Sequence, residues 1–264
     1  MKDLFTFKRF EIKYLIDEEQ MALVQEALDK YMVPDPHGES TICNIYYDTP
    51  DFRLIRTSLE KPKYKEKLRL RSYGQVEKDQ KVFLELKKKF DGVVYKRRIE
   101  LPAEDAENYM LDAKDNGNSL PEDSQIGREI AYFNKYYGTI VPAVHLSYDR
   151  SAYFSNEDPN LRITFDKNIR WRDWDLSLTS KPGGEPILKE GQYLMEVKTS
   201  TGLPIWLMEI ISKGEMIKAS LSKYGRAYET LLERKLAARN WDFRPMEMPS
   251  VMPHRKLGLA LGSY

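Results

Sequence analysis

The chain has 264 residues, of which 41% are hydrophobic and 31% are charged. A chain of this length and composition can build a large globular domain with its own core, which excludes disorder as the main state. The 42 lysines and arginines almost balance the 41 aspartates and glutamates. A net charge of +1 gives the whole chain no general attraction to nucleic acid or to an acidic membrane, so any basic site must be local.

The single cysteine is typical of a protein in a reducing compartment, and the hydropathy of the chain predicts no membrane segment. Cys43 is the only cysteine and cannot form an internal disulfide. The first residues lack the basic region, apolar run and cleavage site of a signal peptide. No window approaches the roughly 18 to 20 consecutive apolar residues that span a bilayer. We therefore expect a cytoplasmic protein with no membrane segment of its own.

Eight runs of alternating apolar and polar residues predict β-strands from one end of the chain to the other. The Asp91-Gly92 dipeptide between the fourth and fifth runs tolerates positive φ, which predicts a tight hairpin and antiparallel pairing. The runs are Phe5–Ile16, Thr41–Asp48, Tyr64–Tyr73, Lys81–Phe90, Val93–Leu101, Ala143–Phe154, Leu161–Trp171 and Gln192–Thr199.

Amphipathic segments between the strands predict five helices. The first runs from a cap at Asp17 to about Tyr31, with Gln20 in the capping-box position. The other four are Glu104–Lys114, Glu122–Tyr137, Ile205–Ile211 and Met216–Ala238. Loops are expected at Asp115–Glu122, at Lys181–Gly191 and from Asp242 onward. We expect one domain over residues 1–240 and a C-terminal tail over residues 241–264.

The charged faces of the predicted strands are biased toward cations. In the third run four cations share one face, opposite two leucines: Lys65, Lys67, Arg69 and Arg71 against Leu68 and Leu70. Apart from Lys65, the charged positions singled out along these runs are eleven cations and four acids. The cations are Arg9, Lys13, Lys67, Arg69, Arg71, Lys87, Lys96, Arg98, Arg150, Arg162 and Lys198, and the acids are Glu11, Glu85, Asp166 and Glu196. Like charges on adjacent strands repel, so such a surface is expected to face a polyanion.

Two arrangements of these strands are open from alternation alone. In one, the charged faces point outward from a sandwich and protect its edges from aggregation. In the other, the strands form an α+β fold in which a closed eight-stranded antiparallel barrel has a basic polar lumen and helices cover its apolar outer face. A basic lumen would hold phosphates, and its few carboxylates suit a hard divalent cation such as Mg²⁺ or Mn²⁺. The combination of features favours the barrel.

Seven motifs in order along the chain resemble the VTC domain, the polyphosphate-polymerase branch of the triphosphate tunnel metalloenzymes, which are relatives of the CYTH fold. The resemblance covers about Phe5 to Glu233. The motifs are Phe7–Leu15, Asn44–Asp51, Lys67–Tyr73, Glu85–Lys89, Ser147–Arg150, Met195–Lys198 and Ser222–Tyr224.

The resemblance implies a tunnel that binds ATP or another triphosphate together with inorganic polyphosphate, and extends polyphosphate with the γ-phosphoryl group of ATP. It implies Mn²⁺ or Mg²⁺, with Glu196 as principal ligand and Glu11 and Glu85 as helpers, and Asp166 as a weaker candidate. The residues with a central role in catalysis are Lys13, Arg69, Arg71, Glu196 and Lys198. The further phosphate ligands are Lys67, Lys87, Lys96, Arg98, Arg150, Arg162, Ser222 and Lys223.

One departure bears on the reaction. The hydrolase and cyclase branches begin with Glu-x-Glu-x-Lys, whereas here Arg9 replaces the first acid before Glu11 and Lys13. Fewer carboxylates weaken the case for water activated by a second metal ion, which favours the polymerase over a triphosphatase. A nucleoside or inorganic triphosphatase and a non-catalytic polyphosphate-binding module are the alternatives. Nucleic acid is not expected, because the basic faces lack interleaved aromatics for base stacking.

Three assignments stay open at this stage. A bulge in the fifth run would turn Arg97, rather than Lys96 and Arg98, toward the lumen. Glu85 pairs either with the metal or with a lysine. Ser222 either contacts phosphate or only polarises the end of a helix.

Overall fold

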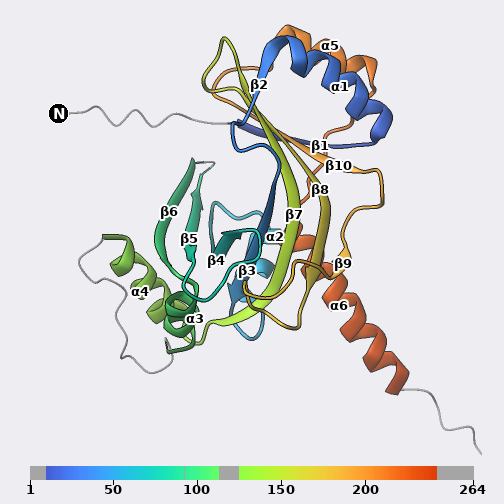
Figure 1. Ribbon diagram of the computed structural model, residues 1–264. Helices are drawn as coiled ribbons and strands as arrows, with labels where there is room; N and C mark the ends of the chain where they lie inside the picture. Colours follow the sequence, from blue (N-terminus) through green and yellow to red (C-terminus); the bar gives the residue numbers. More distant parts are fainter. Residues whose placement is uncertain (1–9, 92, 113–124, 243–264) are drawn as a thin grey trace, which may run out of the picture. The chain divides into compact units, whose positions relative to one another are not determined.

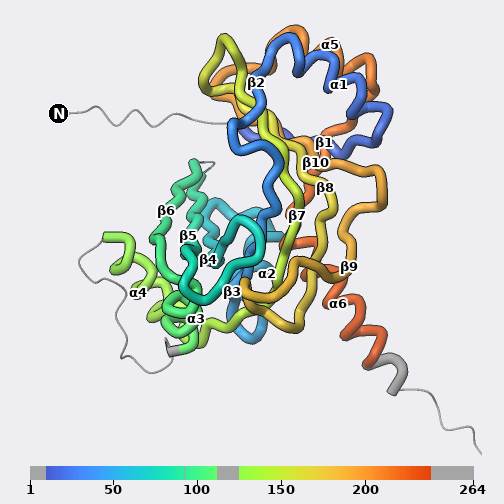
Figure 2. Tube along the Cα trace, in the orientation of Figure 1, coloured from blue at the N-terminus to red at the C-terminus, as the bar shows by residue number. Residues whose placement is uncertain are grey.

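The computed structural model describes residues 10–91, 93–112 and 125–242, shown as a ribbon in Figure 1 and as a Cα trace in Figure 2. The strands, both hydrophobic cores and the polar face described below belong to residues 1–229, the first of two compact units; the second is residues 230–264. The helices are α1 (Glu18–Tyr31), α2 (Arg53–Leu59), α3 (Ala103–Asp112), α4 (Gln125–Tyr137), α5 (Ile205–Lys213) and α6 (Lys223–Asp242). None of the helices in the described ranges has the length and apolar content needed to cross a membrane.

All eight predicted strands are present, and two short ones were not predicted. The eight are β1 (Phe10–Ile16), β3 (Ser40–Asp48), β4 (Tyr64–Tyr73), β5 (Lys81–Phe90), β6 (Val93–Pro102), β7 (Val141–Ser155), β8 (Arg162–Arg172) and β10 (Tyr193–Thr199). The additional strands are β2 (Met32–Pro34) and β9 (Glu185–Pro186), the latter inside a predicted loop. Strands β5 and β6 form the expected antiparallel hairpin, in which Asp91 has a φ of 45°. Residues 5–9 of the first run, Gly92, the predicted loop Asp115–Glu122 and nearly all of the predicted tail lie outside the described residues.

The predicted start of α1 is confirmed, whereas that of α6 is wrong. The Asp17 carboxylate accepts the Gln20 N–H at 2.8 Å, and the Gln20 side chain accepts the Asp17 N–H at 3.1 Å, which completes the capping box. Helix α6 begins at Lys223 rather than at Met216. The preceding segment runs beside β1, where Ala219 donates its N–H to the carbonyl of Lys13 at 2.8 Å. Hydrogen bonds to the sheet therefore replace the expected helical turns.

The main sheet runs in the order β1-β10-β8-β7-β3-β4-β5-β6, and neighbouring strands are antiparallel. Within the described ranges β1 and β6 are its two ends and do not pair, so the expectation of a closed barrel is not met. Charged side chains still interact across the inner face: burial and the positive charges of Arg150 and Lys87 lower the pKa of Lys198 on β10, although the neighbouring Glu11 and Glu196 raise it. Lys87 on β5 is also among the cations that lower the pKa of Glu11 on β1, against the effect of burial.

The outer face of the sheet carries the hydrophobic core, as the arrangement with an apolar outer face covered by helices predicted. On β4 and β5, four leucines are fully buried among side chains of α3 and α4: Leu68, Leu70, Leu84 and Leu86. On β1, β8 and β10, a second cluster packs with α1 and α5 and includes Tyr14, Ile163 and Val197. Figure 1 shows α1 and α5 side by side, in agreement with their shared cluster. Helices therefore cover the apolar face and leave the charged face for another role.

Asp48, at the end of β3, joins three elements through one buried carboxylate. Its oxygens accept the backbone N–H of Leu54 at 2.8 Å and of Ile55 at 3.0 Å, which satisfies the first turn of α2. The same carboxylate accepts the hydroxyl of Tyr224 at 2.8 Å. Tyr224 is the second residue of α6, so this bond attaches the start of α6 to β3 and α2.

We expect Tyr224→Phe to lower the free energy of unfolding by about 2 kcal/mol, because a buried hydrogen bond to a carboxylate contributes roughly 1.5 to 3 kcal/mol. Urea unfolding followed by circular dichroism measures the change. Tyr95→Phe, on the exposed face of β6, is the matched control and should stay within about 0.5 kcal/mol of the wild type. Equal values for the two variants would contradict this role of Asp48.

Candidate functional site

The inner face of the sheet, opposite the hydrophobic cores, collects the predicted site residues of β1, β10, β8 and β7. Cross-strand register places Lys13 opposite Glu196 and Glu11 opposite Lys198. On the next pair of strands Lys198 lies opposite Arg162, and between β7 and β8 Arg150 lies opposite Asp166. Because side chains alternate along a strand, matched register puts these groups on one face. The members are Glu11, Lys13, Glu196, Lys198, Arg162, Asp166 and Arg150.

The same inner face continues over β4, β5 and β6. Arg69 lies opposite Glu85, and Lys67 lies opposite Lys87. Its members here are Lys67, Arg69, Arg71, Glu85, Lys87, Lys96 and Arg98. Arg97 lies opposite Leu86 on the outer face, and its Nε is 3.7 Å from Oε1 of Glu129 on α4. The register of β6 therefore turns Lys96 and Arg98, rather than Arg97, toward the inner face.

Two buried carboxylates, Asp166 and Glu196, form the centre of one ion cluster. Arg150 binds Asp166 through two hydrogen bonds of 2.6 and 2.7 Å, and its Nη2 is 3.5 Å from Glu196. Lys13 Nζ lies 2.8 Å from Glu196 Oε1. Lys223 Nζ lies 3.3 Å from the same oxygen and also forms an ion pair with Asp166. Three cations thus surround two carboxylates.

These cations keep Glu196 ionised. Burial alone would raise the pKa of Glu196, but the charges of Lys223, Lys13 and Arg150 outweigh it and hold the pKa well below the usual range. Burial would likewise lower the pKa of Lys223, yet Asp166 and Glu196 raise it above its usual value. Lys223 is therefore a fixed positive charge on the inner face.

Glu85 forms a second ion cluster, on β5. Its Oε2 lies 2.7 Å from Nη2 of Arg69 and 3.7 Å from Nε of Arg71, and its Oε1 lies 2.6 Å from Nζ of Lys96. Burial raises the pKa of Glu85, but the charges of Arg69 and Arg71 and the contact with Lys96 lower it to about 2. Glu85 is thus bound by cations and does not contact the carboxylates of the first cluster.

Four cations of the inner face form no ion pair with a carboxylate of the described residues: Lys67, Lys87, Arg98 and Lys198. Arg98 lies over the ring of Phe83, 4.7 Å from its centroid. Burial and the charges of three other lysines lower the pKa of Lys67 to about 8, although Tyr46 acts in the opposite direction. The inner face therefore holds positive charge that its own acids do not balance.

The start of α6 reaches this inner face. Ser222 precedes α6, and its Oγ lies 3.3 Å from Nζ of Lys67 on β4. The next residue, Lys223, contacts the carboxylates on β8 and β10. The hydroxyl of Ser222 also accepts the N–H of Gly225 at 3.2 Å. Ser222 therefore both caps α6 and lies beside a predicted phosphate ligand.

Asn44 and Tyr46, which were not among the predicted site residues, hold the arginines of β4 in place. Arg71 donates to Asn44 Oδ1 at 3.1 Å, and Arg69 donates to the Tyr46 hydroxyl at 2.9 Å. Burial raises the pKa of Tyr46, but Arg69, Lys67 and Arg71 together lower it to about 7. The signal was present, because Asn44 and Tyr46 alternate along β3 and lie opposite those two arginines. The pairing of β3 with β4 had to be known before these contacts could be predicted.

The three predicted metal ligands separate into two places. Glu11 and Glu196 are joined through Lys13, whose Nζ is 3.3 Å from the first and 2.8 Å from the second. Glu85 belongs to the other cluster. In the described ranges no three acidic, histidine or cysteine residues are grouped closely enough to hold a metal ion by themselves. Asp166, the weaker candidate, is the carboxylate that shares Arg150 and Lys223 with Glu196.

Comparison with solved structures reveals the class of fold. The protein HpAC1 of Hippeastrum, a candidate adenylyl cyclase with a dominant triphosphatase activity, has 19% identity and a TM-score of 0.50, covering 90% of this chain and 98% of that one. A Vibrio parahaemolyticus protein described as a candidate adenylate cyclase has 12% identity, coverage of 83% and 97%, and a TM-score of 0.44. A Pyrococcus horikoshii protein has 14% identity and a TM-score of 0.42, with coverage of 86% of this chain and 99% of that one.

The likeness to the Hippeastrum structure shows that the two proteins share an α+β fold built on a large antiparallel sheet. The model of the VTC domain matches residues 8–232. This chain therefore belongs to the VTC domain family. No curated protein matches it.

Glu85 should make stability depend on acid pH. Because its pKa is lowered from 4.5 to about 2, its ionised form stabilises the fold above about pH 4.5, and this contribution is lost as the pH falls toward 2. The shift corresponds to about 3 kcal/mol. We expect Glu85→Gln to lower the free energy of unfolding at pH 6 by an amount that shrinks at pH 3.

Urea unfolding at both pH values measures this dependence. Glu104→Gln is the control, because Glu104 is exposed on α3 and pairs with the exposed Lys78. It should change stability little at either pH. A deficit of Glu85→Gln that is the same at pH 6 and pH 3 would rule out a strongly lowered pKa.

Proposed function

We propose that the inner face binds the triphosphate of ATP and a polyphosphate chain, and that the protein is a metal-dependent phosphoryl transferase that elongates polyphosphate. The observation that carries the proposal is the unbalanced charge of Lys67, Lys87, Arg98 and Lys198 on a face where the available acids are already paired. Cations that lie close together without acids repel one another. A bound polyanion removes this repulsion, so such a group of cations favours binding a polyanion. Condensed phosphate carries repeated charge that matches such a surface.

Phosphoryl transfer suits a face built in this way. An oxygen at the end of the polyphosphate chain forms a bond to the γ-phosphorus of ATP, the bond to the oxygen that bridges the β- and γ-phosphates breaks, and ADP leaves with the electron pair. The reaction asks mainly for positioning and for neutralisation of charge, so no nucleophilic side chain is required. Arg69 and Arg71 on one side and Lys13 and Lys198 on the other would hold the phosphates in line.

The cations of the inner face form two rows, and we assign one row to the phosphates of the donor and the other to those of the acceptor. The first row lies on β4 to β6 and comprises Lys67, Arg69, Arg71, Lys87, Lys96 and Arg98. The second lies on β1, β7, β8 and β10, with the start of α6, and comprises Lys13, Arg150, Arg162, Lys198 and Lys223. Ser222 would contact phosphate between them, since its hydroxyl already lies beside Lys67. A long polyanion can touch both rows at once, which a single phosphate cannot.

The donor chemistry of the first cluster fits a divalent cation. Glu196 and Asp166 supply carboxylate oxygens, and Mg²⁺ or Mn²⁺ uses one or two carboxylates and takes further ligands from substrate phosphates. Glu11 would assist through its position beside Lys13. When bound, the ion would neutralise charge on the transferred phosphoryl group. Lys223 and Lys13 now neutralise these carboxylates, so the residues of this chain compete with the ion for the same oxygens.

Removal of Lys223 should therefore strengthen metal binding. We expect Lys223→Met to bind Mn²⁺ more tightly than the wild type in the absence of phosphates, because Asp166 and Glu196 lose a buried counter-charge. Electron paramagnetic resonance of free Mn²⁺ measures the affinity without any turnover. Lys78→Met, at an exposed lysine, should leave it unchanged. Equal affinities for wild type and Lys223→Met would place the metal elsewhere.

The assay that tests the proposed function incubates the purified protein with ATP and Mn²⁺ or Mg²⁺, and measures polyphosphate and free phosphate together. We expect polyphosphate to form, and Glu196→Gln to abolish it. Free phosphate without polyphosphate would identify a triphosphatase. Neither product, with tripolyphosphate still bound, would identify a binding module.

Neighbouring arginines of β6 provide a matched test of the inner face. Arg98→Gln removes an inner cation, whereas Arg97→Gln removes the outer one beside Glu129. A tripolyphosphate concentration one hundred times the dissociation constant should stabilise the wild type by about 2.7 kcal/mol. Compared at that same concentration, Arg98→Gln should show less stabilisation, and Arg97→Gln should behave like the wild type. The absence of any stabilisation of the wild type would contradict phosphate binding by the inner face.

A further inference from the structure

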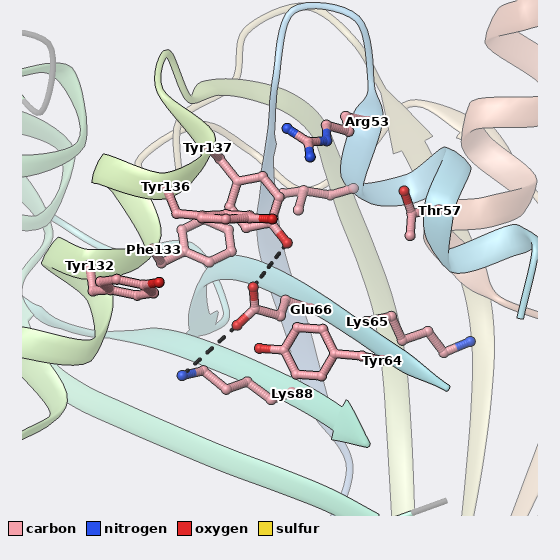
Figure 3. Close-up of a pocket in the computed structure, with 11 residues that line it drawn as sticks. Arg53, Thr57, Tyr64, Lys65, Glu66, Lys88, Tyr132, Phe133, Tyr136 and Tyr137 are labelled. Atoms are coloured by element: carbon pink, nitrogen blue, oxygen red, sulfur yellow. Dashed lines mark hydrogen bonds and ion pairs between the residues drawn. The ribbon is translucent and has the colours of Figure 1, made fainter. Parts of the chain in front are cut away.

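A second concave site lies on the opposite face of the same strands. A cavity of about 360 Å³ opens between the outer face of β4 and β5 and the helices α2 and α4 (Figure 3). Its size lies within the range of small-molecule sites. Tyr64 and Glu66 contribute from β4, Lys88 from β5, Arg53 from α2, and Tyr132 and Tyr136 from α4. The alternation of β4 directs Lys67 inward and Glu66 outward, so this cavity is separate from the inner face.

Aromatic rings form one wall of the cavity. Tyr132 and Tyr136 are nearly parallel, at 22°, with ring centroids 6.3 Å apart. Both are largely exposed, at 67% and 57%, although they lie on a helix that buries its neighbouring Phe133. Tyr64 faces them from β4 and is 46% exposed. Exposed phenol faces around a cavity provide a stacking surface for a planar ring.

Glu66 supplies a carboxylate at the base of the cavity. It is 8% exposed, and its Oε2 accepts the hydroxyl of Tyr137 at 2.9 Å. Lys88 Nζ is 3.9 Å from Glu66 Oε1 but only 3.2 Å from Glu129, so Glu66 is the weaker of its two partners. A carboxylate has about four acceptor positions. Tyr137, Tyr64 and Lys88 use part of this capacity, and the positions left on Glu66 can accept N–H groups of a ligand.

The rim of the cavity is basic. Among its described lining residues, Arg53 and Lys88 outnumber the single acid, Glu66. Lys65 also lies at its edge, but its side chain points away from the tyrosines in Figure 3, and its Nζ donates to the carbonyl of Ser58 at 3.0 Å. Arg53 lies over the rings of Tyr136 and Tyr137, at 5.8 and 5.4 Å from their centroids. This basic rim disfavours an ammonium ligand, which the rings alone would suit. It favours an anion that carries a planar ring.

We propose that this cavity binds a guanine nucleotide, with the base between the tyrosines and Glu66 and the phosphate at the basic rim. The base must donate to a carboxylate. Guanine offers two adjacent donors on its Watson–Crick edge, at N1 and the 2-amino group, whereas adenine places an acceptor at N1 that a carboxylate repels. A phosphorylated ring without N–H donors would leave the remaining acceptor positions of Glu66 unused. The proposal uses none of the inner cations and does not depend on the proposed function.

Isothermal titration with guanosine monophosphate tests this site while excess tripolyphosphate occupies the inner face. We expect binding that is tighter than that of adenosine monophosphate, which lacks the paired donors, and of guanosine, which lacks the phosphate. Glu66→Gln should weaken binding roughly tenfold or more, because one acceptor oxygen becomes a donor while the other can still accept from Tyr137. Tyr132→Ala should also weaken it through lost stacking.

The controls separate this site from the inner face and from a loss of folding. Tyr95→Ala removes an exposed tyrosine of β6 and should bind as the wild type does. Arg69→Gln should weaken tripolyphosphate binding and leave guanosine monophosphate binding intact. The proposal is overturned if no heat is released, if adenosine monophosphate binds equally, or if Glu66→Gln has no effect in a protein whose circular dichroism is unchanged. Binding of tetramethylammonium in place of the nucleotide would also overturn it.

Discussion

The ion clusters around three buried carboxylates are the interaction on which the inner face depends. A buried charge without a partner is strongly destabilising, so Asp166, Glu196 and Glu85 each require cations within reach. Lys13, Arg150 and Lys223 meet this need for the first two from β1, β7 and α6. Arg69, Arg71 and Lys96 meet it for Glu85 from β4 and β6. The acids thereby order the cations around them, and the cations left over define where an anion would lie.

Much of the fold was predictable because strand alternation is a local signal. The buried leucines of β4 and β5 and the cations between them follow directly from a period of two residues. Helix α2 was not predictable in this way, because Asp48, which caps it, lies outside the helix and Phe52 adopts a φ of 59° before it. The predicted start of α6 was wrong for a similar reason. Hydrogen bonding to β1 determines the conformation of the segment before Lys223, and this contact is not local in sequence.

The candidate site was predictable as a face but not as a set of partners. Sequence alternation placed Glu85 and Glu196 among the cations, but only long-range pairing distributes them between two clusters. It also could not detect the electrostatic interaction between Lys198 on β10 and Lys87 on β5, because these strands are far apart in the chain. Tyr46 and Asn44 became visible only once β3 lay beside β4. Strand register therefore shows which side chains become partners, and composition and spacing along the chain do not contain this information.

The attachment of Tyr224 to Asp48 has a consequence for synthesis on the ribosome. Among the strands of the described ranges, β1 pairs with β10 alone, and Lys223 completes the first ion cluster. Residues near the beginning of the chain therefore find their partners only after residues beyond 190 have been synthesised. Until these emerge, the growing chain exposes an unpaired strand edge and buried acids without their cations. The inner face is therefore completed only after residue 223 has emerged, and a chain released before that point would lack a complete inner face.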